Sequence, residues 1–193
     1  MVEEETIFKI EKTTEIVELP DIKNKLEIDI RYPLMAPYAY AHIYWDKKQE
    51  ELIYRVEEPE LSESEQEILR LIMLALEEMI NISIAKVEKV SELINYLERN
   101  VQSILVELGT KVSKDTYLKL MYYIFRDSVG LNRIEPLLND YYIEDIECNG
   151  LGFPIYLVHR KYENIRSTVE FDDMQELTDF VEKLAQKCGR YVS

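Results

Sequence analysis

An unbroken helical pattern between residues 63 and 108 constrains the fold of this chain more than any other feature. The stretch contains no Gly or Pro, and its apolar positions recur at alternating steps of three and four, which places them on one helix face. Ser62 and Glu65 form a capping-box pattern at its start, and Gly109 is suited to its end. The seam along this face consists of Leu69, Met73, Leu76, Ile80, Ser83, Val87, Val90, Ile94, Leu97, Val101, Ile104 and Leu108.

A single helix over these residues would be about 70 Å long at a rise of about 1.5 Å per residue, which exceeds the diameter of a small domain. We therefore expect two helices that break near Asn81-Ile82-Ser83 and pack as a hairpin. One long helix that serves as a coiled-coil arm is the alternative. A third helix should begin after Ser113 and end at Gly130, because apolar residues between them recur at three- and four-residue steps.

Residues 26–59 show the period of strands. Residues 26–30 alternate apolar and polar side chains, and residues 39–45 and 52–56 flank a polar link that suggests a hairpin. Pro33 and Pro37 predict a bend. Aromatic rings concentrate here, and packing of a small sheet is favoured over a recognition surface as their role. These rings belong to Tyr32, Tyr38, Tyr40, Tyr44, Trp45 and Tyr54.

The stretch from Tyr141 to Lys161 predicts a strand pair that positions several basic side chains close together. Residues 143–148 alternate and end at the turn dipeptide Asn149-Gly150, and the β-branched run 155–158 leads into His159-Arg160-Lys161. Another strand is expected over residues 167–171. A helix capped by Asp172 or Asp173 should follow and run to Gly189.

Together these elements predict an α+β fold, in which an N-terminal helical bundle with a small β hairpin element precedes a small α/β subdomain. We expect a flexible N-terminus over residues 1–25, where Glu and Lys dominate. The bundle with its aromatic β element should then occupy residues 26–130, and the α/β subdomain residues 131–193.

The distribution of charged residues along the chain indicates which classes of binding partner to expect. The net charge is −15, and residues 1–110 carry 24 acidic and 12 basic side chains against 14 and 11 in residues 111–193. Such a front half repels phosphate backbones and anionic lipids, so we expect no nucleic-acid partner and favour a basic protein. Cys148 and Cys188 are isolated, and neither a signal peptide nor an apolar run of membrane-spanning length is visible. A cytoplasmic protein is therefore expected.

Catalytic patterns are easier to exclude than to find. The Walker pattern is absent, and GxGxxG fails because Ile155 stands where its third glycine is required after Gly150 and Gly152. His42 and His159 lack metal-site spacing, so we expect no metal site and no catalytic residue. Arg160, Lys161 and Arg166 lie within seven residues of one another and together can bind an anion; scattered surface ion pairs are the alternative.

Several segments resemble the N-terminal region of archaeal type II and type IV secretion ATPases, the GspE-like motors that include archaellum and archaeal pilus assembly ATPases. The resemblance covers residues from about 32 to the end and is most specific over 122–161. Its segments are Tyr32-Pro33-Leu34, residues 37–40 (PYAY), residues 54–59 (YRVEEP), residues 122–127 (YYIFRD) with Gly130, residues 134–140 (IEPLLND), residues 143–150 (IEDIECNG), Pro154-Ile155-Tyr156, residues 159–162 (HRKY) and residues 184–193 (LAQKCGRYVS).

This resemblance implies a cytoplasmic homo-hexamer whose C-terminal RecA-like domain binds ATP and Mg2+. The N-terminal domain would ride above it and dock on a polytopic membrane platform protein and accessory proteins at the inner face of the cell membrane. Arg160, Lys161 and Arg166 match the family's basic strand-and-loop region, which implies nucleotide or inter-domain contact, and Arg190 is a further candidate. No Walker motif occurs before Ser193, so we expect no ATPase activity from this chain alone. A self-standing acidic adaptor that oligomerises through the 69–108 seam is the alternative.

Overall fold

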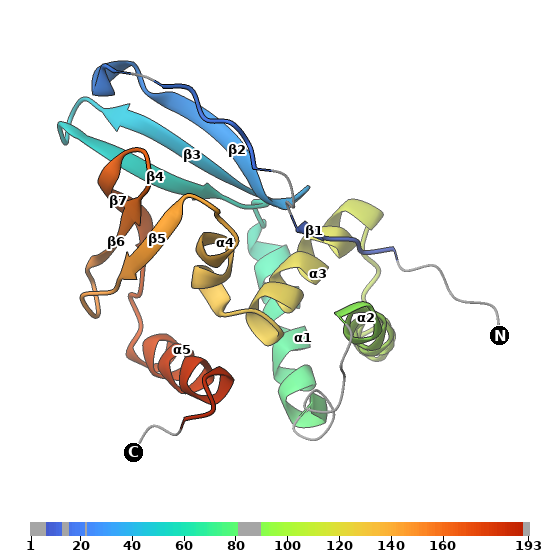
Figure 1. The fold of residues 1–193 in the computed structure, drawn as a ribbon. Helices are drawn as coiled ribbons and strands as arrows, with labels where there is room; N and C mark the ends of the chain where they lie inside the picture. Colours follow the sequence, from blue (N-terminus) through green and yellow to red (C-terminus); the bar gives the residue numbers. More distant parts are fainter. Residues whose placement is uncertain (1–6, 13–15, 22, 81–89, 191–193) are drawn as a thin grey trace. The chain divides into compact units, whose positions relative to one another are not determined.

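The structure, a computed structural model, describes residues 7–12, 16–21, 23–80 and 90–190 and has the expected α+β architecture (Figure 1). Its described residues fall into two compact units. The helical unit contains residues 7–9 and 59–130, and the sheet unit contains residues 10–58 and the chain from residue 131 onward. Each unit has its own core, and the candidate site belongs to the sheet unit.

Three helices form the helical unit: α1 (Glu63–Ile80), α2 (Val90–Glu107) and α3 (Lys114–Ser128). Each of them packs against the other two. Because α1 and α2 lie against each other, they form two packed helices and not one rod, as the hairpin interpretation expects. The expected break at 81–83 lies outside the described residues. The core of this unit includes Phe8, Ile72, Leu76, Leu97, Val101, Ile104, Leu120, Met121, Tyr122, Ile124 and Phe125.

Local capping signals set the ends of these helices. The Ser62 backbone N–H donates to Glu65 Oε2 at 2.8 Å, and the Glu65 N–H donates to Ser62 Oγ at 3.3 Å, which is the reciprocal capping box expected from the sequence. Thr116 N–H donates to Ser113 Oγ at 3.1 Å and caps α3. Gly109 follows α2 with a φ of 62°, a conformation that a glycine adopts without strain. The predicted starts of α1 and α3 and the predicted end of α2 are therefore confirmed.

One seven-stranded sheet organises the other unit, in the order β1-β2-β3-β4-β7-β6-β5. Neighbouring strands are antiparallel except β4 and β7, which run parallel with Ile53 opposite Arg166 and Tyr54 opposite Ser167. The strands are β1 (Glu11–Lys12), β2 (Asp29–Ala36), β3 (Ala39–Asp46), β4 (Glu51–Glu57), β5 (Ile143–Glu147), β6 (Pro154–His159) and β7 (Glu163–Glu170). Two 3-10 turns, η1 (Lys25–Glu27) and η3 (Asn132–Ile134), and helices α4 (Glu135–Leu138) and α5 (Met174–Lys187) complete the unit.

The division into units differs from the one expected in where the aromatic strands belong. A boundary near residue 130 is observed, but residues 29–57 group with the C-terminal strands instead of the helical bundle. The physical reason is the pairing of β4 with β7, which joins the two strand sets into one sheet with one core. Sequence periodicity does not report which distant strands pair. This core includes Ile43, Tyr54, Ile155, Leu157, Ile165 and Phe171.

Two side chains are buried in the described parts of residues 1–25, the segment expected to be flexible, and most of the others are exposed. Phe8 is 1% exposed, and its backbone N–H donates to Glu98 Oε1 at 2.8 Å within the helical unit. Leu19 is 4% exposed in the sheet unit. A strand was also expected from Leu26, but that residue lies in η1 with an exposed side chain, and β2 begins at Asp29.

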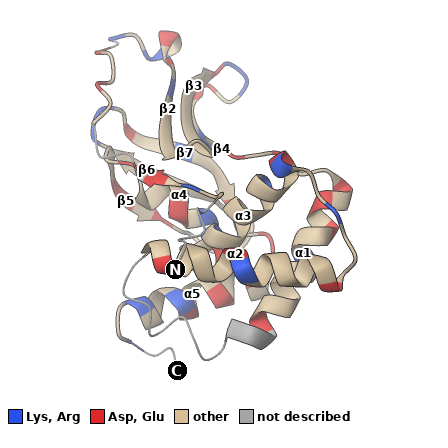
Figure 2. Cartoon of the chain, turned by 90° about the vertical axis from the view of Figure 1, so that its right-hand side faces the viewer, with Lys and Arg blue, Asp and Glu red and all other residues tan. Residues whose placement is uncertain are grey.

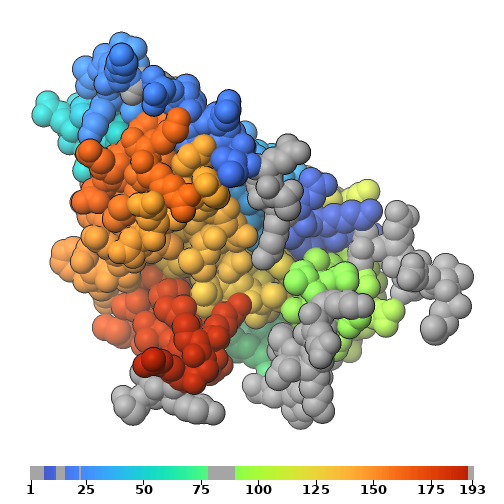
Figure 3. Space-filling model, viewed as in Figure 1, coloured from blue at the N-terminus to red at the C-terminus, as the bar shows by residue number. Residues whose placement is uncertain are grey.

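Helix α5 follows β7 and adjoins β5–β7 on the face shown in space-filling representation (Figure 3). The predicted cap is present, because Glu176 N–H donates to Asp173 Oδ1 at 2.9 Å. Phe180 is the buried residue of this helix, and its ring centroid lies 5.1 Å from that of Phe171. Phe180 therefore provides the buried aromatic contact of α5, and the Arg133–Glu176 ion pair and the Lys183–Asn132 hydrogen bond also hold this helix. Among the described residues, no helix combines the length and apolar character needed to cross a membrane.

Candidate functional site

Asp140, between α4 and β5, is the centre of the most extensive buried polar network of the sheet unit. Its Oδ2 accepts hydrogen bonds from Tyr32 Oη and Tyr54 Oη, each at 2.6 Å, and its Oδ1 accepts from the Tyr142 backbone N–H at 2.8 Å. Because these donors come from β2, β4 and the approach to β5, one carboxylate joins three parts of the sheet. We call Asp140, Tyr32, Tyr54, Tyr142 and His159 the Asp140 centre.

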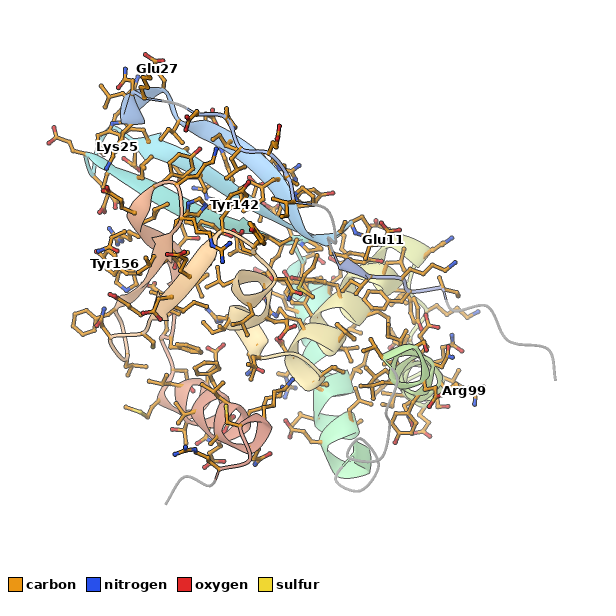
Figure 4. The ribbon with its side chains drawn as sticks, viewed as in Figure 1. Glu11, Lys25, Glu27, Arg99, Tyr142 and Tyr156 are labelled. Carbon is orange, nitrogen blue, oxygen red and sulfur yellow. The ribbon has the colours of Figure 1, made fainter. Side chains whose placement is uncertain are left out.

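His159 ends β6 and lies between two tyrosine rings. The ring centroids of Tyr142 and Tyr162 are 5.4 Å and 4.9 Å from that of the imidazole, with interplanar angles of 17° and 15°. Lys161 N–H donates to His159 Nδ1 at 3.2 Å, which assigns the imidazole proton to Nε2. That Nε2 faces Tyr32 Oη at 3.5 Å. The histidine is therefore held as a neutral ring inside an aromatic stack, of which Tyr142 is labelled in Figure 4.

Burial controls the protonation of this centre. Desolvation lowers the pKa of His159 from 6.5 to about 4, and Lys161 acts in the same direction, while Asp140 opposes the shift. Desolvation and the neighbouring Asp140 carboxylate raise the pKa values of Tyr32 and Tyr54 well above the ordinary value of 10.0. At neutral pH both tyrosines are therefore hydrogen-bond donors, and the imidazole is uncharged.

The hydrogen bonding of the centre suits a structural role better than catalysis. Both oxygens of Asp140 already accept donors, and Nδ1 of His159 accepts the Lys161 N–H. Asp140 and His159 are 6% and 1% exposed. A general base needs a lone pair that reaches the substrate, and these lone pairs are engaged inside the protein. The arrangement holds strands in register and positions the segment that carries Arg160 and Lys161.

Two of the predicted contact residues lie in the turn between β6 and β7. The Arg160 guanidinium lies 4.4 Å from the Tyr141 ring centroid, and its Nε is 3.3 Å from Glu144 Oε1; its side chain is 42% exposed. Lys161 Nζ donates to the Leu19 carbonyl at 2.5 Å. Arg160 is thus presented to solvent on an aromatic support, while Lys161 is engaged within the unit.

The other two predicted cations lie elsewhere in the sheet unit. Arg166 on β7 donates to Gln49 Oε1 and lies 3.2 Å from Glu51 Oε1, so it is tied to the β3–β4 hairpin. Arg190 follows α5, with an exposed side chain. The structure therefore gives the four residues different partners and does not gather them into one basic cluster. Lys and Arg are interspersed with Asp and Glu along the chain (Figure 2).

A second polar group surrounds His42 on β3. Its Nε2 lies 2.7 Å from Asp29 Oδ1 and its Nδ1 lies 3.1 Å from Glu57 Oε1, and Arg31 Nε donates to Glu57 Oε2 at 2.6 Å. The hydrogen bond from Arg31 lowers the pKa of Glu57. These side chains form a cross-strand hydrogen-bond network that includes the Arg31–Glu57 ion pair. Within residues 7–12, 16–21, 23–80 and 90–190, no three His, Cys, Asp or Glu side chains are grouped so as to hold a metal ion.

Sequence reasoning identified neither Asp140 nor the tyrosine partners of this centre as a site. Tyr32 and Tyr54 were grouped with an aromatic sheet, and His159 with the cations that follow it. The only local signal is the placement of Asp140 directly before two tyrosines at the entry to a strand. The two tyrosine hydroxyls that donate to Asp140 belong to residues 108 and 86 positions away, a separation that no motif spacing encodes.

No protein-family model matches the chain. Two proteins of the archaeon Methanocaldococcus jannaschii are similar in sequence, and both carry the name "uncharacterized protein". The first, MJ1288, is 29% identical over 170 residues, which is 88% of this chain and 66% of the relative. The second, MJ0900, is 31% identical over 83 residues, which is 43% of this chain and 15% of the relative. The chain thus spans just under two thirds of the first relative and a small part of the second.

Proposed function

We propose that this chain is the N-terminal regulatory and docking domain of a hexameric secretion, archaellum or pilus assembly ATPase. In this proposal a RecA-like domain of the parent protein binds and hydrolyses ATP with Mg2+. The present chain couples the resulting motion to a polytopic membrane platform protein at the inner face of the cell membrane. By itself the chain has no ATPase activity.

One observation carries the proposal. The segments that resemble secretion ATPases are scattered between residue 32 and the end of the chain, yet they supply four of the five members of the Asp140 centre. Tyr32, Tyr54, Asp140 and His159 all lie in those segments and meet through hydrogen bonds or ring contacts. The matched residues come from separate segments of the sequence but meet in one buried centre. This supports similarity of a folded unit, which is a stronger argument than similarity of short, isolated sequence motifs.

The relatives add support of a different kind. Because this chain spans 66% of MJ1288 and 15% of MJ0900, both relatives contain further sequence beyond the part that resembles it. That is the arrangement expected of a module joined to other domains. The alignment with MJ0900 reaches a protein several times longer than the aligned segment, as a motor domain attached to a docking domain would require.

Arg160 is the residue through which we propose the coupling. Its guanidinium lies over the Tyr141 ring and forms an ion pair with Glu144, so it is held in place while still exposed. A guanidinium presented in this way can exchange a surface carboxylate for a phosphate, to which it binds through two parallel hydrogen bonds. In this proposal Arg166, which contacts the β3–β4 hairpin, and Lys161, which contacts Leu19, take part in contacts between domains. Arg190 is proposed to take part in the same contacts.

The alternative, an adaptor that oligomerises through the 69–108 seam, has less support. Leu97 and Ile104 would have to lie on an interface between chains, but they are 0% and 3% exposed within the helical unit. A seam that is buried inside its own unit cannot pair with a second chain unless the unit opens.

Association with a motor domain tests the proposal. The chain would be mixed with a purified RecA-like domain that carries a Walker motif and comes from the same organism, and its binding measured by sedimentation with and without a non-hydrolysable ATP analogue. We expect association that strengthens with nucleotide. Absence of association in both conditions would contradict the proposal, whereas a concentration-dependent dimer of the chain alone would favour the adaptor.

A further inference from the structure

Residues 16–21, which we call the strap, have no regular secondary structure and lie beside the Asp140 centre, where the Val17 carbonyl contacts Tyr142. Three side chains hold its backbone. Tyr142 Oη donates to the Val17 carbonyl at 2.7 Å, Lys161 Nζ donates to the Leu19 carbonyl at 2.5 Å, and Tyr162 Oη donates to the Pro20 carbonyl at 3.4 Å. We call Tyr142, Lys161 and Tyr162 the clasp. Tyr142 is labelled in Figure 4.

Some contacts of the strap involve its backbone and do not depend on its sequence, whereas others involve a particular side chain. All three clasp donors bind main-chain carbonyls, which any extended polypeptide presents. Only Leu19 of the strap is buried, at 4% exposed, whereas Ile16, Glu18, Pro20 and Asp21 are exposed. Proteins that capture extended peptides use this division, in which backbone hydrogen bonds provide affinity and one or two buried side chains provide specificity.

Buried contacts hold the two tyrosines of the clasp, whereas the strap has one buried side chain. The two tyrosines of the clasp are the rings that enclose His159, and Tyr142 N–H is bonded to Asp140, so their positions are set by the buried centre. The strap, in contrast, buries one leucine and has no ladder of backbone pairs in the described residues. Segments with few buried apolar contacts open at low cost compared with the core.

We propose that the clasp is a binding site for an extended polypeptide segment, that the strap occupies it in cis, and that a partner segment with a leucine before a proline competes for it. Acidic residues beside that leucine, like Glu18 and Asp21 of the strap, would suit the positive charge of Lys161. Displacement would free residues 16–21 and the three hydrogen-bond donors of the clasp. This inference concerns the sheet unit by itself and does not depend on a motor domain.

A labelled peptide with the sequence of residues 16–21 tests the proposal by fluorescence anisotropy. The wild-type chain should bind it weakly, because a tethered strap competes at an effective concentration on the order of millimolar. In the variant Leu19→Asp the strap loses its anchor, and the peptide should bind about tenfold more tightly or better. The matched control is Ile16→Asp, which adds the same charge at an exposed strap position and should bind no better than wild type. Adding Tyr142→Phe to Leu19→Asp removes one clasp donor while keeping the ring, and should weaken peptide binding.

A second measurement on the wild-type chain keeps the test valid if Leu19→Asp does not fold. The chain would be treated with a protease that cleaves after glutamate, and cleavage after Glu18 would be followed by mass spectrometry. The added peptide would carry glutamine in place of its glutamate, so that the protease does not cleave it. Saturating peptide should speed cleavage at Glu18 several-fold, and a peptide with aspartate in place of leucine should not. Unchanged cleavage at Glu18, or equal peptide affinity of a folded Leu19→Asp variant and the wild type, would overturn the proposal.

Discussion

Tyr54 Oη donates to Asp140 Oδ2 at 2.6 Å, although the two residues are 86 positions apart and lie in different halves of the sheet unit. This hydrogen bond joins β4 to the loop that leads into β5. Tyr32 donates to the same oxygen, so the single carboxylate satisfies two buried hydroxyl groups. The stability of the sheet unit should therefore depend strongly on Asp140.

Replacing Asp140 by Ala should destabilise the chain by about 2 to 4 kcal/mol, because two buried tyrosine hydroxyls and one backbone N–H lose their acceptor. Urea denaturation followed by circular dichroism measures the change. The matched control is Asp145→Ala on β5, where the side chain is exposed and the loss should stay within about 0.5 kcal/mol. Equal denaturation midpoints for the two variants would contradict the account of the Asp140 centre.

Stability should also depend on pH through His159. Burial lowers its pKa to about 4 in the folded chain, against 6.5 when exposed, so the unfolded chain binds a proton first as the pH falls. The contribution of this group is fully present above pH 6.5 and is lost progressively as the pH falls from 6.5 towards 4. The full loss is on the order of 3 kcal/mol, from about 1.4 kcal/mol per pKa unit.

The pH effect is measured as the difference between the wild type and His159→Gln, because carboxylates titrate in the same range. Urea midpoints would be recorded between pH 7 and pH 5. The wild type should lose stability faster over this interval than the variant, whose side chain does not titrate. Parallel pH profiles for the two proteins would show that His159 is not held neutral by burial.

Phe180 is the buried residue of α5, so its truncation should loosen this helix. Phe180→Ala removes the buried ring that packs on Phe171 and should cost about 3 kcal/mol, whereas Val181→Ala at the neighbouring exposed position should cost less than about 0.5 kcal/mol. Hydrogen exchange of the α5 amides measures the loosening locally. Exchange rates in α5 that are unaffected by Phe180→Ala would refute this description of its anchoring.

Substitutions in the seam of α2 test whether this seam is buried within one chain or forms an interface between chains, as the adaptor alternative requires. Leu97→Asp places a charge in the buried core and should destabilise the helical unit by more than about 3 kcal/mol. Val106→Asp adds the same charge to the same helix at a position that is 80% exposed, and should be tolerated. Thermal unfolding and sedimentation would be recorded for both. If Leu97→Asp left the thermal transition unchanged but halved the mass in sedimentation, the adaptor would be the better account.

Features encoded by neighbouring residues could be predicted from the sequence. The capping box at Ser62, the cap at Ser113 and the hairpin between β3 and β4 each depend on residues a few positions apart, and each is present. The strand pair formed by β5 and β6 is also present. In all of these the chemistry of a short segment is enough to determine its structure.

Features that depend on distant residues could not be predicted in this way. The parallel pairing of β4 with β7 joins Tyr54 to Ser167 and transfers the aromatic strands from the expected bundle to the sheet unit. The Asp140 centre and the clasp likewise connect residues more than 80 positions apart. A hydrogen bond between such residues depends on the completed fold, because neither partner is marked by its own neighbours.

The proposed function is tested most directly by the ATP hydrolysis rate of a RecA-like motor domain titrated with this chain. The account predicts that the wild-type chain changes this rate, and that Arg160→Ala loses most of the effect. Its denaturation midpoint should stay near that of the wild type, since the Arg160 side chain contacts the exposed Glu144 and Tyr141 side chains at the surface. Hydrolysis kinetics that are identical with the wild type, with Arg160→Ala and with no added chain would contradict it.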